Sequence, residues 1–407
     1  MRGALSTLVR SRPTGGMTVS VLGDTFADVV CRPLEHLPGW GKDTLVSEPI
    51  RIMLGGSAAN FAVHATNLNK AQPVIAAPTV TGEAGGVEAT PEGKAKVPSS
   101  GDGAAGEGYR HQTCLLHTSV ASDSMGEFVR RELDEYGVTW SQTKAHEHQG
   151  ACVVLSGLED RSFVTHRGSA ALFCREDIDV PRLLESSHVH VGKFCDMAGF
   201  YNCPALWQDL PDILTEAKAS GASCSLGPQW DASEEWGGLE SLYPYLDVFL
   251  PNEDEALNIS GCSDVADAAS FFLDRGVGLV VVTRGAGGAL AVSRRGASAG
   301  SSGREGSGEA GGTGGGDGAG SGGGGVRRTW EQKCVPVEVV DTTGAGDAFS
   351  AGFLHVWKAT GGGTGGAVDG DVQAALRWGC AVGTAVVTRV GATSRLSVEE
   401  DIRPNLV

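Results

Sequence analysis

Short β-like runs alternate with helical patterns along most of this chain, and this alternation constrains the fold more than any other feature. The expected strands end at Gly, Pro or a polar residue and cover residues 18–23, 113–121, 188–192, 222–226, 246–250, 279–283 and 289–293. Helical patterns lie between or after them, at 124–136 and 371–387. Parallel strands need long crossovers, which are usually helices. The sequence therefore predicts an α/β fold with helices on both faces of a largely parallel sheet.

Three further strand-like stretches do not fit this alternation. Residues 44–53, 151–156 and 162–166 are separated by polar turns and carry β-forming residues. We expect them to form a small sheet outside the main one.

Glycine is concentrated in one place instead of being spread along the chain. Of the 407 residues 61 are Gly, and residues 296–325 are about half glycine without a large apolar side chain. Residues 81–108 also lack periodicity. We interpret both as low-complexity inserts in one domain over 18–395, followed by a C-terminal tail at 396–407. Residues 1–17 contain three Arg and no acid before the first strand, which fits either an organelle-targeting segment or an unstructured leader.

The overall charge and apolar pattern exclude two classes of partner. The chain has 49 acidic and 32 basic residues, a net charge of -17, so it lacks the basic surface that a nucleic-acid backbone needs. Its apolar runs, such as 278–283 and 381–387, are far shorter than a membrane span. The ten cysteines form no C-x-x-C pair, which is typical of a reduced, cytoplasmic protein.

The segment Asp341-Thr-Thr-Gly-Ala-Gly-Asp347 carries the clearest chemical signal. It follows a strand-like run at 335–340 and opens an apolar helical pattern. The N–H groups of Gly344, Ala345 and Gly346 would then point to one place at the positive end of a helix, where a phosphate binds. Asp347 in the first turn would lie where it could accept the proton of an attacking hydroxyl. Alternatively, the glycines make only a tight turn and Asp347 caps the helix.

Two common phosphate-binding motifs do not match this segment. No Gly-Lys-Ser/Thr follows the glycines, which excludes a Walker A loop, and Phe349 stands at the third glycine position of a Rossmann fingerprint.

The segment does resemble the C-terminal D-T-x-G-A-G-D signature of the ribokinase-like, or PfkB, carbohydrate kinases. The stretch Gly55-Gly-Ser-Ala-Ala-Asn60 is similar to the N-terminal signature of that family, and Gly23-Asp24 stands before it at a strand end. Asn252-Glu-Asp-Glu255 and Thr283-Arg-Gly-Ala-Gly-Gly288 also resemble family segments, in the expected order. Gly227-Pro228 is a departure, because family members often have Asp before this Pro.

The resemblance implies a ribokinase-like three-layer α/β/α sandwich with a small β-sheet lid. It implies an ATP-dependent kinase that uses Mg and phosphorylates a hydroxyl of a sugar-like molecule, with Asp347 as general base and Gly344–Gly346 as anion hole. By the same resemblance, Asp24, Gly55, Gly56 and Asn60 bind the acceptor, and Asn252, Glu255, Thr283, Gly285 and Gly288 bind the nucleotide. Glu255 would belong to the Mg shell, and Asp341 with carbonyls near Arg389 and Gly391 to a monovalent-cation (K) site.

Each of these residues also has a structural interpretation. Asp24 could form a turn and Asn60 cap a helix, Asn252 and Glu255 could begin an ordinary helix, and Thr283 with Gly285 could end a strand. His188, His190 and Cys195 could be taken for zinc ligands, but we favour structural histidines because no tetrahedral set is complete.

Two alternative functions remain open at this stage. A nucleoside kinase of the same family would be favoured by an acceptor pocket lined with aromatic rings, and a non-catalytic ligand-binding pseudokinase is the other. The lid resembles the element through which several family members dimerise, so we expect a homodimer.

Overall fold

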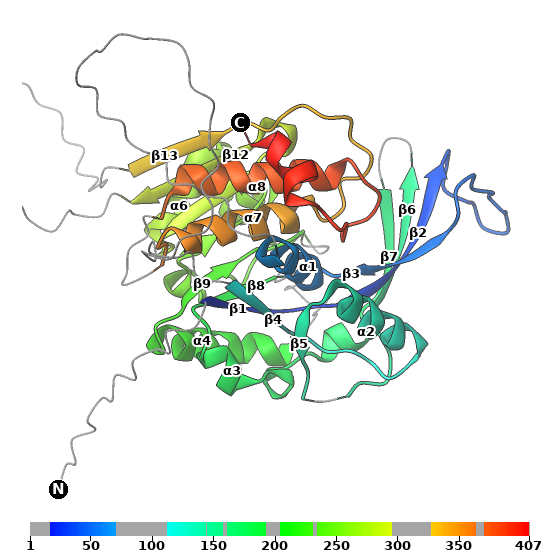
Figure 1. Ribbon diagram of the computed structural model, residues 1–407, viewed down its shortest axis with the longest axis horizontal. Coiled ribbons are helices and arrows are strands. Elements are labelled where there is room, and N and C mark those ends of the chain that lie inside the picture. Colours follow the sequence, from blue (N-terminus) through cyan, green and yellow to red (C-terminus); the bar gives the residue numbers. More distant parts are fainter. Residues whose placement is uncertain are drawn as a thin grey trace, which may run out of the picture.

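The computed structural model describes residues 17–70, 112–143, 145–157, 161–192, 204–230, 234–294, 327–363 and 370–406. Residues 1–16 of the expected leader, both expected inserts and Cys195 lie outside these ranges. Figure 1 shows a layered body with a smaller sheet projecting from one side.

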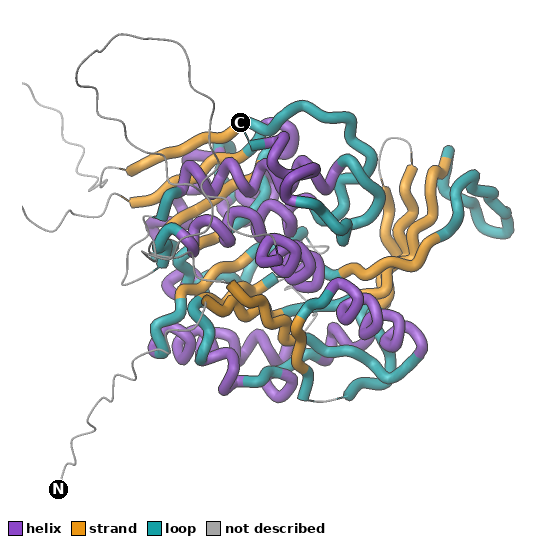
Figure 2. The backbone as a smooth tube through the Cα atoms, in the orientation of Figure 1, coloured by secondary structure: helices purple, strands orange, loops and turns teal. Residues whose placement is uncertain are grey.

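Strands of the described residues form a main sheet that runs through the centre of the body (Figure 2). They are β1 (Met17–Leu22), β4 (Gln112–His117), β5 (Thr139–Ser141), β8 (His188–Val191), β9 (Ser223–Leu226), β10 (Val248–Phe249), β11 (Leu279–Thr283), β12 (Ala289–Arg294) and β13 (Arg327–Gln332). Their order is β13-β12-β11-β10-β9-β8-β1-β4-β5. Pairing is parallel from β11 to β5, and β12 and β13 add an antiparallel edge.

Helices cover both faces of this sheet, as the sequence predicts. One hydrophobic core joins the sheet to α1 (Ser57–Lys70), α2 (Ser124–Tyr136), α7 (Ala345–Ala359) and α8 (Val372–Val387). The other joins it to α3 (Val180–Leu184), α4 (Pro204–Ala219), α5 (Glu253–Ser260) and α6 (Val265–Asp274). Along β11, Leu279 and Val281 face the first core while Val280 and Val282 face the second. This period of two confirms the three-layer α/β/α architecture.

The small sheet has the order β3-β2-β6-β7 in the described residues. It consists of β2 (Phe26–Leu34), β3 (Arg51–Gly55), β6 (Ala151–Gly157) and β7 (Arg161–His166). The sequence prediction found β6 and β7 but missed β2, because its apolar side chains are interrupted by Asp28, Arg32 and Pro33. The strand expected over 44–53 begins only at Arg51.

One further prediction is wrong. Residues 335–340 are not a strand but an extended connection, although they are rich in Val; the strand before the glycine segment is β13. Their side chains are mostly half-buried or exposed. This run of valines therefore lacks the buried face that an apolar strand of a sheet normally has.

The last residues form short helical turns, η5 (Val398–Ile402) and η6 (Arg403–Asn405), that contact α8. Ile402 is buried in the first core, so the expected tail contributes to the body. Among the described helices, none has both the length and the apolar character to cross a bilayer.

Candidate active site

The chain turns sharply at Gly344, where α7 begins. Gly344 caps the helix with φ +75°, and a Cβ there would lie 2.5 Å from the Cβ of Ala392. Both facts require glycine. The first N–H groups of α7 therefore open onto the C-terminal edge of the sheet, where an anion is favoured. Ala345 N–H also donates to Thr342 O at 3.3 Å, which leaves Gly346 as the better placed of the expected donors.

Asp347 lies in the first turn of α7 and is 9% exposed. Its Oδ1 accepts hydrogen bonds from Ser57 Oγ at 2.5 Å and Gln229 Nε2 at 3.0 Å, and its Oδ2 accepts one from Asn60 Nδ2 at 2.8 Å. Burial raises the pKa of Asp347 from its ordinary value of 3.8 to about 7, against the lowering effect of these donors. A carboxyl that exchanges a proton near neutral pH is suited to acid–base chemistry.

The residues expected to bind an acceptor lie at the junction of the body and the small sheet. Asp24 stands between β1 and β2, and its Oδ1 accepts the N–H of Ala58 at 3.2 Å. Gly56 has φ +97° and would clash with the Asp24 carbonyl if it carried a Cβ, so it lets the two segments meet. Asn60 faces Asp347 from the next turn of α1, and its Oδ1 is buried without a hydrogen-bond partner in the described residues.

Two cavities meet at Asp347. The inner cavity, of about 230 Å³, lies at the strand ends of the body, and its polar walls include Asn252, Glu255, Thr283, Gly346 and Ser350. The lid cavity, of about 400 Å³, lies against the small sheet, and its walls include Asp24, Asp28, Gly56, Ser57, Asn60 and Arg167. Gln229, Gly344 and Asp347 line both cavities. A group bound in one cavity would therefore meet a group bound in the other beside Asp347.

The start of α5 brings Asn252 and Glu255 to the inner cavity through a capping box. Asn252 Oδ1 accepts the N–H of Glu255 at 2.8 Å, and Glu255 Oε2 accepts the N–H of Asn252 at 2.9 Å. Asn252 and Glu255 therefore do cap an ordinary helix, as their structural interpretation predicted, and both residues also line the inner cavity. Burial, with smaller contributions from the charges of Asp347 and Asp254, raises the pKa of Glu255 to about 7.

The structure separates the residues expected to bind the nucleotide. Thr283 pairs with Asn252 at the adjoining ends of β11 and β10 and lines the inner cavity. Gly285 and Gly288 form the turn between β11 and β12 and do not line it. Of the two glycines expected to bind the acceptor, Gly56 lines the lid cavity. Gly55 does not line it, and lies at the end of β3 next to the side chain of Asp28.

Asp341 lines neither cavity, although Thr342 and Thr343 next to it do, and its side chain ties two segments together. Its Oδ1 accepts from the N–H and Oγ1 of Thr343, and its Oδ2 accepts from Gly391 N–H at 2.9 Å. These bonds hold the segment that leads into Gly344 against residues 389–392.

The histidines of β8 have structural partners. His188 Nδ1 and Nε2 lie 2.7 Å from Ser223 Oγ and Ser225 Oγ, and His190 Nδ1 lies 2.8 Å from Ser225 Oγ. Burial lowers the pKa of both histidines. The described residues contain no group of three or more His, Cys, Asp or Glu side chains arranged to hold a metal ion.

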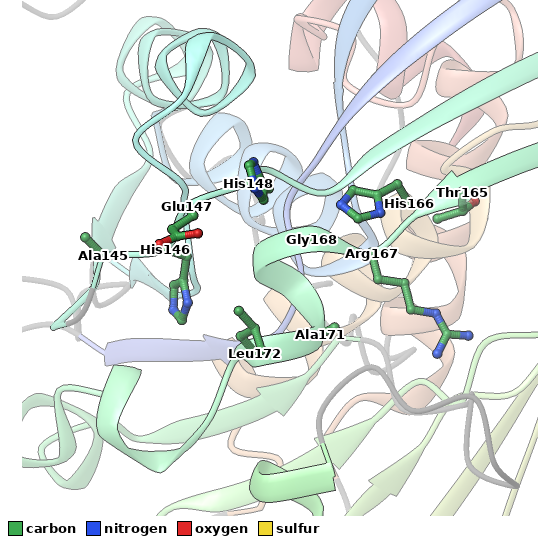
Figure 3. A pocket seen from close by; sticks show the side chains of 10 residues that line it. All are labelled: Ala145, His146, Glu147, His148, Thr165, His166, Arg167, Gly168, Ala171 and Leu172. Atoms are coloured by element: carbon green, nitrogen blue, oxygen red, sulfur yellow. The ribbon is translucent and has the colours of Figure 1, made fainter.

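A third cavity, of about 770 Å³, lies beside the end of β7, and Figure 3 shows its lining. His146, His148 and His166 surround it, while the side chain of Arg167 extends away from them. His146 Nε2 is 3.1 Å from Asp177 Oδ1 in a buried pair that anchors this segment. The cavity is not lined by Asp347, but it shares Thr165 and Arg167 with the lid cavity.

Several residues at the site escaped the sequence analysis. Ser57 lies inside a segment that was recognised, and Gln229 directly follows the unusual Gly227-Pro228, so both were close to an available signal. The lid cavity also has three aromatic walls, Phe26, Phe163 and Trp230, which come from separate parts of the chain. No local pattern brings those three together.

Comparison with known proteins agrees with this geometry. The family model described as "pfkB family carbohydrate kinase" matches residues 112–305 and 313–399. Ribokinase from Haemophilus influenzae is 29% identical over 394 residues, which cover 94% of this chain and 96% of the relative. Fructoselysine 6-kinase from Escherichia coli is 28% identical over 60% of this chain and 74% of the relative. Cytidine kinase from Thermococcus kodakarensis is 33% identical over 40% and 48%.

Solved structures show the same fold. A putative ribokinase II from E. coli in complex with ATP and Mg²⁺ has a TM-score of 0.64 at 20% identity and covers 96% of this chain and 100% of its own. Adenosine kinase from Sinorhizobium meliloti has a TM-score of 0.64 at 17% identity, with 96% and 99% covered. The family match spans more than half of the chain, and the related proteins are kinases of hydroxyl acceptors. The chain is a phosphotransferase that belongs to the pfkB family of carbohydrate kinases.

Proposed function

We propose that the protein transfers the γ-phosphoryl group of ATP to a hydroxyl of a sugar or sugar-like molecule. The observation that carries this proposal is the position of Asp347, where the inner cavity and the lid cavity meet. ATP phosphates would lie in the inner cavity, and the acceptor hydroxyl would approach from the lid cavity.

In this mechanism Asp347 accepts the proton of the acceptor hydroxyl while the hydroxyl oxygen attacks the γ-phosphorus and the bond to ADP breaks. The N–H groups at the start of α7, with that of Gly346 best placed, stabilise charge on the transferring group. Asp24 and Asn60 orient the acceptor, since a carboxylate and an amide match the donors and acceptors of hydroxyls. Because the pKa of Asp347 is about 7, its basic form prevails above neutral pH and activity falls as the pH drops through 7.

Mg²⁺ fits the donors of the inner cavity. Glu255 is buried there, and its negative charge is disfavoured by desolvation and by Asp347, so a cation would offset that cost. We propose that Glu255 and Asn252 help to hold the hydrated ion, which neutralises phosphate charge when it is bound. Thr283 would contact the nucleotide from the adjoining strand end, and the turn at Gly285 and Gly288 would lie farther out. A monovalent cation at Asp341 stays a prediction. The hydrogen bond between Gly391 N–H and Asp341 brings this carboxylate next to the segment around Arg389 and Gly391, whose carbonyls are the other predicted ligands.

The aromatic walls of the lid cavity favour a second candidate, a nucleoside acceptor. Phe163 and Trp230 are 53% and 51% exposed, so their faces are open to stack on a planar base. The relatives include a cytidine kinase as well as a ribokinase. We retain the sugar as the first candidate because Asp24, Asp28 and Asn60 bring three polar side chains to the same cavity.

We also propose a homodimer formed through the small sheet. Ile50, Ile52 and Val164 expose apolar surface there, each with more than half of its area open. Light scattering at micromolar concentration should give twice the chain mass, and a monomer would contradict this assignment.

A coupled ADP-release assay with ATP, Mg²⁺ and a panel of free sugars and nucleosides tests the function. We expect phosphorylation of at least one sugar-like acceptor. If only nucleosides react, the second candidate replaces the first, and if the folded protein binds acceptors without turnover, it is a non-catalytic binding protein.

A further inference from the structure

Gln229 lies at the boundary between the inner cavity and the lid cavity. Together with Gly344 and Asp347, it lines both cavities, so its side chain stands where the acceptor hydroxyl and the phosphoryl group would meet. Gln229 also contacts the site directly: its Nε2 donates to Asp347 Oδ1 at 3.0 Å and to Ser57 Oγ at 2.8 Å.

The three donors to Asp347 differ in how firmly they are held. Ser57 and Asn60 belong to the first turn of α1, where both residues are buried. Gln229 belongs to a connection after β9 instead. Its φ of +64° is a conformation that non-glycine residues rarely adopt, and such strain is often found at functional positions. Gln229 is therefore the donor that can leave Asp347 most easily.

We propose that Gln229 is a positioning residue that holds Oδ1 of Asp347 in the acceptor-free enzyme and is replaced there by the acceptor hydroxyl. This inference rests on the proposed role of Asp347 as general base. The exchange would keep the buried carboxylate hydrogen-bonded at each stage, because one donor replaces another as water is excluded.

The charged and titratable groups around Asp347 determine how the exchange should change its pKa. Asp24, Asp28 and Arg167 line the lid cavity with Asp347, and Glu255 and His190 line the inner cavity. Burial lowers the pKa of His190 to about 3, so it is neutral at working pH. Asp24 raises the pKa of Asp347, and the hydrogen bond from Gln229 lowers it. Loss of that bond should therefore raise the pH at which Asp347 becomes a base.

The test compares Gln229→Met, which keeps the length but removes the donor, with Gln208→Met on the exposed face of α4 as the matched control. The pH dependence of kcat/KM reports the free enzyme, and that of kcat reports the enzyme with bound acceptor. We expect Gln229→Met to move the acidic limb of kcat/KM upward by about one pH unit and to leave the limb of kcat in place. At pH 7 kcat/KM should fall about fivefold and should recover at pH 9. The control variant should follow the wild type.

Three outcomes overturn the inference. An unchanged kcat/KM profile shows that Gln229 does not act on the carboxyl, an equal shift in both profiles shows that it stays bound throughout, and loss of activity at every pH shows a different role. If the wild type phosphorylates nothing, the proposed function fails instead. A double-mutant cycle of thermal unfolding with Gln229→Met and Asp347→Asn then decides on the contact, with coupling expected at pH 9 and absent at pH 4. Gln229→Asn replaces the Met variant if that variant does not fold.

Discussion

The two cavities at Asp347 are built in different ways. The inner cavity is formed by the ends of β10 and β11 and by the start of α7, which belong to the buried body. The lid cavity takes its outer wall from the small sheet and from Trp230, where large aromatic surfaces remain exposed. Under the proposed function, phosphoryl transfer would depend on the buried body, whereas the choice of acceptor would depend on the more exposed side chains of the lid cavity. Variants on the two sides should therefore affect different kinetic constants.

Asp347 belongs to both cavities, so its loss should have the largest effect. We expect Asp347→Asn to lower kcat by about 10²-fold or more, because the amide cannot accept the hydroxyl proton. The KM for ATP should change little, since the phosphate-binding N–H groups stay in place. Steady-state kinetics on the identified acceptor measure both constants, and near-wild-type turnover of a folded variant would refute the base assignment.

The same substitution should change how stability depends on pH. The pKa of Asp347 is about 7 in the folded protein and lower in the unfolded chain, so the folded state binds the proton more tightly. The stability associated with the protonated carboxyl is complete below about pH 4 and is lost as the pH rises through 7. Asp347→Asn should thus be more stable relative to wild type at pH 8 than at pH 4, by about 4 kcal/mol. Denaturant unfolding at the two pH values measures this difference, and a constant difference would contradict the raised pKa.

Asp24 tests the acceptor side of the comparison. Removal of its carboxylate in Asp24→Ala leaves acceptor hydroxyls without a partner at a buried site, which costs about 1 to 3 kcal/mol. We expect kcat/KM for the acceptor to fall by about one to two orders of magnitude, while the KM for ATP stays close to its wild-type value. A loss confined to ATP binding would contradict the assignment of Asp24 to the acceptor. Asp24→Asn serves as the isosteric control for lost charge.

Trp230 separates the two classes of acceptor within the lid cavity. Its exposed ring, packed edge-to-face with Trp236 at 5.0 Å, offers a stacking surface. With a free sugar as acceptor, Trp230→Ala should raise the acceptor KM by roughly threefold or less. A base stacked on the ring would lose about 1 to 3 kcal/mol, so a rise of about tenfold or more would favour a nucleoside. Phe163→Ala provides a second measurement at another aromatic side chain of the same cavity.

The sequence predicted the body of the protein better than its lid, for a physical reason. Strand alternation and the segments at Gly55–Asn60 and Asp341–Asp347 are local patterns. They pointed to the three layers, to Gly56 and Asn60 in the lid cavity, and to Gly344 and Gly346 in the inner cavity. Phe26, Phe163 and Trp230 meet only because β2, β7 and the connection after β9 converge, and no local pattern records that convergence. The Val-rich residues 335–340 show the converse, since apolar residues did not make a strand where the fold left them half exposed.

The smallest effect is expected at the glycine-rich insert, whose flanking residues Arg294 and Arg327 line neither cavity. The paired strands β12 and β13 bring Arg294 directly opposite Arg327, so a two-residue turn is long enough to join them. Replacement of residues 295–326 by Asn-Gly should therefore leave kcat and both KM values unchanged within about twofold, because loop length alone has a small entropic cost. Thermal unfolding should stay cooperative with a similar midpoint. A loss of cooperativity would show that the segment contributes to the body, whereas a selective change in the KM for ATP would link it to nucleotide binding.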